Sequence, residues 1–181
     1  MNNFIKQQAE ERAVFENFMR VCEYSIIKES IQQQNPPSPD IFCKLEIGIA
    51  IEFELANSID PELAQKMNDE KVSDKGGFCN DEPIERIIWN KNQKLKEGKY
   101  TLHAGRFELL IYLGMNPVWP YWQRTIPQFL EKNKNHWGFD GIWIFRDCQE
   151  NPKVLWFYQK SDCFSGKGRS SDTSSRARLL R

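Results

Sequence analysis

Residues 35–56, with the sequence NPPSPDIFCKLEIGIAIEFELA, constrain the fold of this chain more than any other stretch. The stretch begins with three prolines, which exclude a helix interior, and passes through one acid into two short apolar segments. Pro39 fixes its own φ and disfavours the helical region for Ser38. Asp40 therefore enters an extended segment at a defined point of the chain.

The two apolar segments predict a β-hairpin. Residues 41–45 form its first strand and residues 47–55 its second, with the turn at residues 46–48. In a hairpin the start of the first strand lies opposite the end of the second. We therefore expect the side chains of Asp40 and Glu52 to face each other across the pair, about 5 Å apart.

Two carboxylates held this close repel each other unless a cation lies between them. Oxygen ligands backed by water suit a hard divalent ion such as Mg²⁺. Bound Mg²⁺ can activate water and stabilise the charge on a phosphate under attack. Glu54 lies on the same strand face as Glu52. It is therefore either a further metal ligand or an excess negative charge that makes the site inactive. The other interpretation is an ordinary hairpin whose acids point to solvent.

Pro39-Asp40 followed by Glu52-Phe53-Glu54 resembles the pattern of the PD-(D/E)XK nuclease superfamily, which places Pro-Asp and (Asp/Glu)-x-Lys on adjacent strands. The resemblance covers residues 10–115. It implies a restriction-endonuclease-like fold of the α/β class, with a central mixed β-sheet flanked by helices. It also implies a metal-dependent nuclease that uses Mg²⁺, with Mn²⁺ as a substitute. Glu54 stands where the pattern has lysine, so an active enzyme needs a lysine from elsewhere.

Residues 4–34 predict one long helix, because apolar residues recur there at steps of mostly three and four. In the nuclease superfamily that the hairpin resembles, a glutamate of the first helix often reaches the metal, usually through water. Glu16, at the border of the apolar face, is the first candidate for this role and Glu11 is the second.

Residues 83–97 predict a second helix, whose apolar stripe ends at Leu95 and places Lys91 on the inward face. A lysine in a buried stripe is costly unless it snorkels to the surface or meets a carboxylate. Nucleases of the resembling superfamily can supply the missing strand lysine from a neighbouring helix. Lys91 is placed to do so, with Lys94 as the second candidate, and would orient the attacking water or stabilise the developing charge. A snorkelling lysine on a surface helix is the alternative.

The remaining elements fit a central sheet with helices around it. Residues 106–113 predict a buried strand, and residues 141–146 and 154–158 predict a strand pair. We also expect a short helix at residues 61–71, a substrate-ordered loop at 72–83, an aromatic packing cluster at 118–122 and a helix or irregular segment at 123–135.

The length of 181 residues predicts one domain, assigned to residues 1–160, followed by a flexible basic tail at 161–181. No apolar run approaches the roughly 20 residues that span a bilayer, so a cytoplasmic protein without membrane contact is expected.

The five cysteines are odd in number and lie apart from the two histidines, which argues against a zinc site or a disulfide framework. Cys22 and Cys43 are predicted to be small core residues.

Charge is distributed unevenly along the chain, although the formal net charge is zero. Residues 1–90 hold 9 Lys and Arg against 17 Asp and Glu, whereas residues 91–181 hold 16 against 8. A chain that binds a polyanion around an acidic metal centre has this pattern, and so has a chain whose halves neutralise each other. The overall neutrality argues against strong indiscriminate DNA binding.

These features predict a nuclease that hydrolyses phosphodiester bonds in nucleic acid, with DNA as the expected substrate. Cutting both strands of a duplex would favour a homodimer. The predicted catalytic residues are Asp40, Glu52, Glu54 and Lys91, and the predicted metal ligands are Asp40, Glu52 and Glu16. The alternatives are a catalytically inactive nuclease-fold binding or regulatory module, and an unrelated α+β interaction protein.

Overall fold

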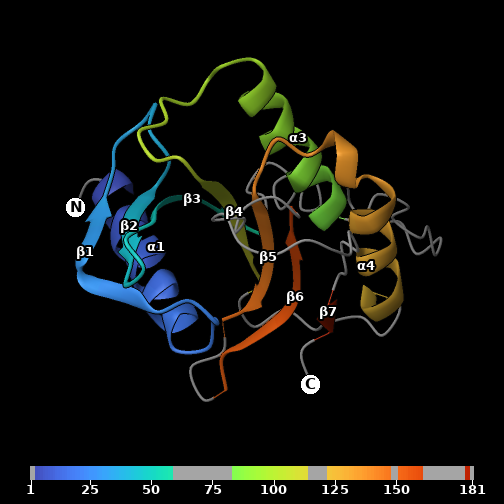
Figure 1. Ribbon diagram of the computed structural model, residues 1–181, viewed down its shortest axis with the longest axis horizontal. Coiled ribbons are helices and arrows are strands. Elements are labelled where there is room, and N and C mark those ends of the chain that lie inside the picture. Colours follow the sequence, from blue (N-terminus) through green and yellow to red (C-terminus); the bar gives the residue numbers. More distant parts are fainter. Residues whose placement is uncertain (1–2, 59–82, 114–121, 148–150, 161–177, 180–181) are drawn as a thin grey trace.

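A mixed β-sheet runs through the part of the chain that the computed structural model describes, which comprises residues 3–58, 83–113, 122–147, 151–160 and 178–179 (Figure 1). Its seven strands follow one another across the sheet in sequence order. They are β1 (Ile26–Gln33), β2 (Ile41–Leu45), β3 (Ala50–Asn57), β4 (Phe107–Tyr112), β5 (Gly141–Arg146), β6 (Lys153–Gln159) and the two-residue β7 (Arg178–Leu179). The pairs β3–β4 and β4–β5 are parallel and the other pairs are antiparallel.

Helices lie on both faces of this sheet (Figure 1). Helix α1 (Asn3–Met19) lies on the concave side of β1, β2 and β3. Helices α3 (Pro83–Lys96) and α4 (Trp122–Lys132) and the short 3₁₀-helix η1 (Lys134–His136) cover the other face. The predicted α/β class, with a mixed sheet flanked by helices, is confirmed. Among the helices described, none combines the length and the apolar character needed to cross a bilayer.

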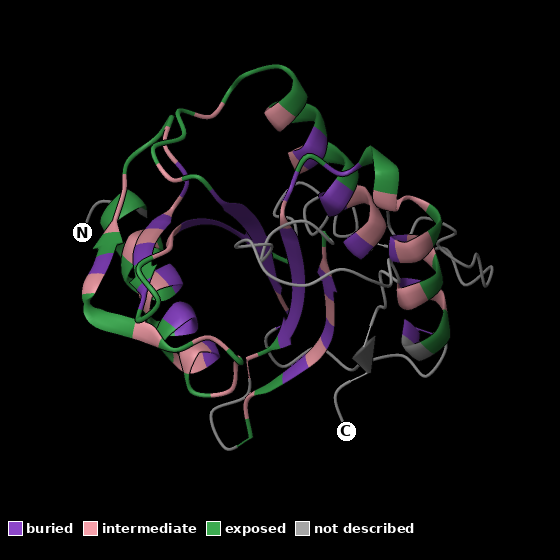
Figure 2. Ribbon diagram, viewed as in Figure 1, coloured by how far each residue is buried: buried purple, intermediate pink, exposed green. Residues whose placement is uncertain are grey.

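Strand β3 is buried on both sides, as expected for a strand that is covered by helices on its two faces (Figure 2). Ile51, Phe53 and Leu55 pack with α1 in one hydrophobic core. The alternate side chains of Glu52 and Glu54 point to the opposite face, the side of α3. The fold thus holds two carboxylates in positions where apolar side chains would be expected.

The single helix predicted at residues 4–34 is wrong in its second half. Helix α1 ends at Met19, and the chain then forms β1, which pairs antiparallel with β2 through Ile26 and Leu45. Strand β1 is largely exposed, so its apolar spacing carried little information about its secondary structure. Pairing with β2 satisfies its backbone groups and overrides the weak local preference.

The predicted hairpin is confirmed, but its register differs from the expected one. The turn at residues 46–48 forms with Gly48 at a φ of +83°, a conformation that glycine adopts without strain. Ile41 lies opposite Phe53 and Phe42 lies opposite Glu52. Strand β3 continues to Asn57, two residues beyond its predicted end. Continuing this register places Asp40 opposite Glu54, so the expected pairing of Asp40 with Glu52 is wrong.

The predictions for the later part of the chain agree with the structure where it is described. The helix at 83–97, the strand at 106–113 and the strand pair at 141–146 and 154–158 are confirmed as α3, β4, β5 and β6. The segment at 123–135 forms most of α4 and η1. The predictions at residues 61–71, 72–82 and 118–121 lie outside the described residues. In the predicted tail the structure describes residues 178–179 alone, which pair with β6.

Candidate active site

Four charged side chains come together where α1, the start of β2, strand β3 and α3 meet. They are Glu11 from α1, Asp40 immediately before β2, Glu54 from β3 and Lys91 from α3. Lys91 contacts Glu54, Asp40 accepts a hydrogen bond from the N–H of Leu55, which follows Glu54, and the charges of Glu54 and Glu11 raise the pKa of Asp40. We call these four residues the acid cluster.

Glu54 and Lys91 form a tight ion pair in the acid cluster. The ammonium Nζ of Lys91 lies 2.5 Å from Oε1 of Glu54, and the two side chains are 22% and 9% exposed, respectively. The hydroxyl of Tyr100 donates to the same oxygen at 3.1 Å. Two donors on Oε1 fix the rotamer of Glu54, and its carboxylate compensates the desolvation of the lysine. The predicted inward position of Lys91 is confirmed.

Asp40 is the most perturbed acid of the cluster. Burial and the neighbouring charges of Glu54 and Glu11 raise the pKa of Asp40 to about 7. The backbone N–H of Leu55 donates to Oδ2 of Asp40 at 2.7 Å, and this bond, together with the Lys91 charge, opposes the rise. At neutral pH the Asp40 carboxyl therefore exchanges between its neutral and its charged form.

Glu11 is the glutamate that α1 contributes to the cluster. It is buried, and burial is the main cause of its raised pKa. The amide of Gln7 donates to its Oε1 at 2.8 Å, which opposes the rise, and the charge of Glu54 adds to it. Gln33 of β1 donates to its Oε2 at 3.4 Å. Glu11, the second candidate from the sequence, is thus the helical glutamate that the structure brings to the cluster.

Glu16 and Lys94 are not brought to the cluster. Glu16 is exposed and forms an ion pair with Arg12 of the same helix at 2.7 Å. Lys94 is also exposed, three residues after Lys91 on α3. The structure therefore brings Glu11, and not Glu16, toward Asp40 and Glu54, because Glu16 lies on the exposed side of α1.

The structure places Glu52 against backbone N–H groups of a loop. Its side chain is fully buried, and its Oε2 accepts hydrogen bonds from the backbone N–H groups of His103 and Ala104, both at 2.9 Å. With its amide oriented to satisfy its neighbours, Gln34 brings a nitrogen within 3.3 Å of Glu52 Oε1 and 3.0 Å of the Pro39 carbonyl. Glu52 thus anchors the loop between α3 and β4 beside the acid cluster.

The loop that Glu52 anchors also carries Tyr100 into the cluster. The N–H of Thr101 donates to the carbonyl of Pro37 at 3.0 Å, which joins the loop to the segment before Asp40. The ring of Tyr100 packs on Phe107, with 5.2 Å between the ring centroids. The position of Tyr100 toward Glu54 is therefore fixed from both ends of the loop. The sequence showed no periodic signal from which the role of this loop could be inferred.

A divalent ion fits this donor set only in a largely hydrated form. In the described part of the chain, no group of three or more His, Cys, Asp or Glu side chains is arranged to hold a metal ion. Mg²⁺, however, keeps several waters and commonly takes one or two carboxylates from a protein. Asp40 and Glu54 supply hard oxygen ligands, and a cation between them would relieve their repulsion. The residues therefore fit a hydrated ion and do not form a closed protein cage.

The two described cysteines behave as core residues, as predicted. Cys43 is buried and packs in the core beneath α1, and Cys22 lies at its border. Burial raises the pKa of Cys43 to about 12 and that of Cys22 to about 11. Both thiols are therefore protonated at neutral pH, which does not favour metal binding or nucleophilic chemistry.

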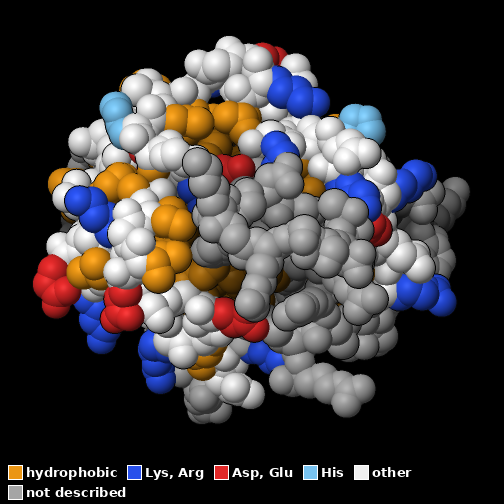
Figure 3. Space-filling view, in the orientation of Figure 1, with side chains coloured by type: hydrophobic (Ala, Val, Ile, Leu, Met, Phe, Trp, Pro, Cys, Tyr) orange, Lys and Arg blue, Asp and Glu red, His pale blue; other side chains and the backbone are white. Residues whose placement is uncertain are grey.

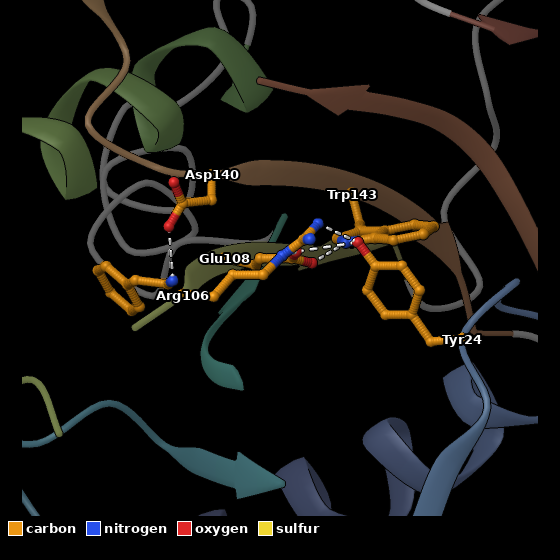
Figure 4. Close-up of polar contacts among 6 residues, drawn as sticks. Tyr24, Arg106, Glu108, Asp140 and Trp143 are labelled. Atoms are coloured by element: carbon orange, nitrogen blue, oxygen red, sulfur yellow. Dashed lines mark hydrogen bonds and ion pairs between the residues drawn. The ribbon is translucent and has the colours of Figure 1, made fainter. Parts of the chain in front are cut away.

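A second polar cluster lies in the core on the α1 side of the sheet (Figure 4). Glu108 of β4 is fully buried and pairs with Arg106. Its Oε1 also accepts a hydrogen bond from the Tyr24 hydroxyl at 2.9 Å, and its Oε2 accepts one from Trp143 Nε1 at 2.6 Å. Burial raises the pKa of Glu108, and Arg106 opposes this. We call these four residues the core polar cluster; no residue spacing in the sequence indicates it.

No family model, no curated protein and no solved structure matches this chain. Its function must therefore be inferred from the geometry of the acid cluster and its surroundings.

Proposed function

We propose that the chain is a metal-dependent nuclease that hydrolyses phosphodiester bonds in nucleic acid. The observation that carries the proposal is the convergence of Asp40, Glu54 and Lys91, from three separate elements, at one partly buried place. The PD-(D/E)XK pattern that the sequence resembles has three such residue types. They are the aspartate of a Pro-Asp pair, an acid on the adjacent strand and a lysine.

The observed register changes how that pattern maps onto the strand. Glu54, which lies opposite Asp40, is the better match to the acidic position than Glu52. The residue two positions further along is then Ala56, so the strand has no lysine at the expected place. Lys91 of α3 supplies the ammonium group instead, through its contact with Glu54.

Each residue of the acid cluster has a distinct task in this proposal. Asp40 and Glu54 would hold a hydrated Mg²⁺ or Mn²⁺ ion, and Glu11 would hold one of its waters. The ion would activate water and stabilise the charge on the phosphate. Lys91 orients the attacking water or stabilises the developing charge, because its ammonium group is already held in position by Glu54. Tyr100 keeps Glu54 in place.

The surface charge gives further support for a nucleic-acid substrate. Lys and Arg side chains gather on the part of the surface that lies over α3 and α4 (Figure 3). Helix α3 alone carries four basic residues against one acid, Glu85. A cationic helical layer next to an acidic site lowers the cost of bringing a phosphate backbone to the carboxylates. DNA is the proposed substrate, and a homodimer is proposed for cleavage of both strands of a duplex.

The test is a cleavage assay on supercoiled plasmid and on single-stranded DNA and RNA, with Mn²⁺ or Mg²⁺ against EDTA. We expect cleavage with the metal, none in EDTA, and a loss of at least about a hundredfold in Asp40→Asn and Glu54→Gln, since each removes a ligand charge. Glu16→Gln is the matched control and should cleave as the wild type does. Absence of cleavage with every substrate and both metals would end the proposal.

A catalytically inactive binding or regulatory module is the second candidate. The short contact between Lys91 and Glu54 favours it, because the lysine already neutralises one of the two carboxylates that would hold the ion. Titration with Mn²⁺ separates the candidates. An active site should bind the ion at millimolar concentration and lose that binding in Asp40→Ala, whereas an inactive module would bind no ion and still bind nucleic acid.

A further inference from the structure

Trp89 is an exposed aromatic side chain on a rigid aromatic base. It lies on α3 with 40% of its surface exposed. Its ring centroid lies 4.9 Å from that of Trp137, 6.4 Å from that of Phe129 and 6.4 Å from that of the His136 ring. A large apolar ring that remains this accessible at the end of an aromatic cluster offers its surface to a further flat partner.

The base beneath Trp89 is fixed by the side chain of Asn92. This residue is buried, donates to the His136 carbonyl at 3.1 Å and accepts from the Gly138 N–H at 2.8 Å. Trp137 Nε1 donates to the Leu130 carbonyl at 3.3 Å. These bonds fasten η1 and the segment after it to α3 and α4. Trp89 therefore loses little conformational freedom when a partner binds.

Basic side chains flank the exposed indole. At 100° per residue, Arg86, Trp89 and Lys96 fall on one side of α3. The His136 ring lies beside the indole, and Lys134 precedes His136 by two residues on η1. Three acids lie close in sequence: Glu85 on α3, Glu97, which pairs with Lys99 at 2.6 Å, and Glu131, which pairs with Lys134 at 2.5 Å. With Glu97 and Glu131 each paired to a lysine, Arg86 and Lys96 stand against Glu85 and the face remains net positive.

We propose that this face, made of Arg86, Trp89, Lys96, Lys134 and His136, binds an unpaired segment of nucleic acid, with one base stacked on the Trp89 indole and phosphates at Arg86 and Lys96. We call it the Trp89 face. Stacking on a fixed aromatic ring beside basic side chains is how proteins bind single strands without reading their sequence. A base in a duplex has no free surface for such a contact, so the proposed ligand is single-stranded.

The Trp89 face is linked to the acid cluster through α3. Lys91 follows Trp89 by two residues, about 200° around the helix, so the two side chains lie on opposite sides of α3. They are separated by about one helix diameter, roughly 10 Å, which a few nucleotides span. The choice of nucleic acid as the ligand rests on the proposed function, and the inference refines the proposed substrate to nucleic acid that carries an unpaired segment.

Binding is measured in EDTA by fluorescence anisotropy of a labelled 12-nucleotide oligothymidine, with a duplex of equal length for comparison. We expect binding of the single strand to weaken about tenfold in Trp89→Ala and to remain near the wild-type value in Trp89→Phe. Lys96→Gln should lower the salt dependence of binding. Ile47→Ala, which removes an exposed apolar side chain in the β2–β3 turn, is the matched control and should change nothing.

Equal affinity for duplex and single strand, or unchanged affinity in Trp89→Ala, would overturn the proposal. Lys96→Gln leaves the aromatic base intact, so an unchanged salt dependence in that variant would also overturn the proposal, even if Trp89→Ala fails to fold. Because no cleavage is needed, binding without cleavage would leave this inference standing while the nuclease proposal fails. Cleavage together with unaltered binding in Trp89→Ala would support the nuclease proposal and overturn the proposal for the Trp89 face. Failure of the wild type to bind any oligonucleotide at low salt would also overturn the proposal for the Trp89 face.

Discussion

The ion pair between Lys91 and Glu54 determines whether the acid cluster can work as a site. Replacing Lys91 with methionine keeps most of the aliphatic stem but leaves Glu54 partly buried with Tyr100 as its remaining donor. We expect Lys91→Met to lower cleavage by at least about a hundredfold and the free energy of unfolding by about 2 kcal/mol. Steady-state cleavage rates and urea denaturation measure the two effects. Lys94→Met, on the exposed side of α3, should change neither.

Asp40 gives the cluster a pH dependence whose sign follows from its raised pKa. The carboxyl titrates near 7 in the folded protein and at its ordinary value of 3.8 in the unfolded chain. Between these values the folded state binds more protons, so the free energy of unfolding falls as the pH rises from about 4 to 7, by up to about 4 kcal/mol, and is constant above.

Asp40→Asn should remove this slope, because asparagine still accepts from the Leu55 N–H and does not titrate. In EDTA we therefore expect the variant to be more stable than the wild type at pH 8 and close to it at pH 4. Urea midpoints at several pH values measure the difference. Parallel curves for the two proteins would show that Asp40 titrates normally and that the acids of the cluster are not coupled.

Residue spacing predicted the positions of Asp40 at the start of an extended segment and of Lys91 on the inward side of α3. The proline before Asp40 fixed where an extended segment begins, and the interrupted apolar stripe of α3 marked Lys91 as inward-facing. The same reasoning could not separate Glu52 from Glu54, since both lie on one face of β3. Their roles depend on a register offset of two residues and on a distant loop, and neither is encoded in the local pattern.

At the scale of elements, the loop between α3 and β4 links the acid cluster to the rest of the sheet. Glu52 holds this loop through two backbone N–H groups. Glu52→Ala leaves both groups without their acceptor, so we expect faster hydrogen exchange at His103 and Ala104 and reduced activity, while Mn²⁺ binding persists. Glu54→Gln should show the converse, with loss of Mn²⁺ binding and an unchanged loop. Loss of Mn²⁺ binding in Glu52→Ala with unchanged exchange would make Glu52 a direct ligand.

Elements were predictable where the apolar pattern reflects burial on one or two faces. Strands β4 and β5 and helix α3 have such patterns and were predicted close to their observed bounds. Strand β1 was not, because its side chains are mostly exposed and its secondary structure is decided by pairing with β2. Its sequence also continues the helical spacing of α1, which extended the predicted helix too far.

At the scale of the whole molecule, the core polar cluster ties together segments that are far apart in sequence. Tyr24 precedes β1, Arg106 and Glu108 belong to the β4 region, and Trp143 lies on β5 (Figure 4). Gly141 is part of this packing, since a Cβ there would lie 2.9 Å from the Glu108 carboxyl carbon. A contact set of this kind depends on the completed sheet, which explains why spacing along the chain gave no sign of it.

The stability of the whole fold should therefore depend on Glu108. Glu108→Ala leaves the Arg106 guanidinium buried without its carboxylate, and we expect a loss of about 3–5 kcal/mol in the free energy of unfolding. The double variant Arg106→Leu with Glu108→Leu removes both charges and should regain part of this loss, because no buried charge is left uncompensated; the recovery is incomplete because Tyr24 and Trp143 lose Glu108 as their acceptor. Glu46→Gln, on the exposed β2–β3 turn, is the control and should leave the urea midpoint unchanged. If the single variant unfolds at the wild-type midpoint, or the double variant is less stable than the single, the charge pair does not hold the two parallel strands and Tyr24 together.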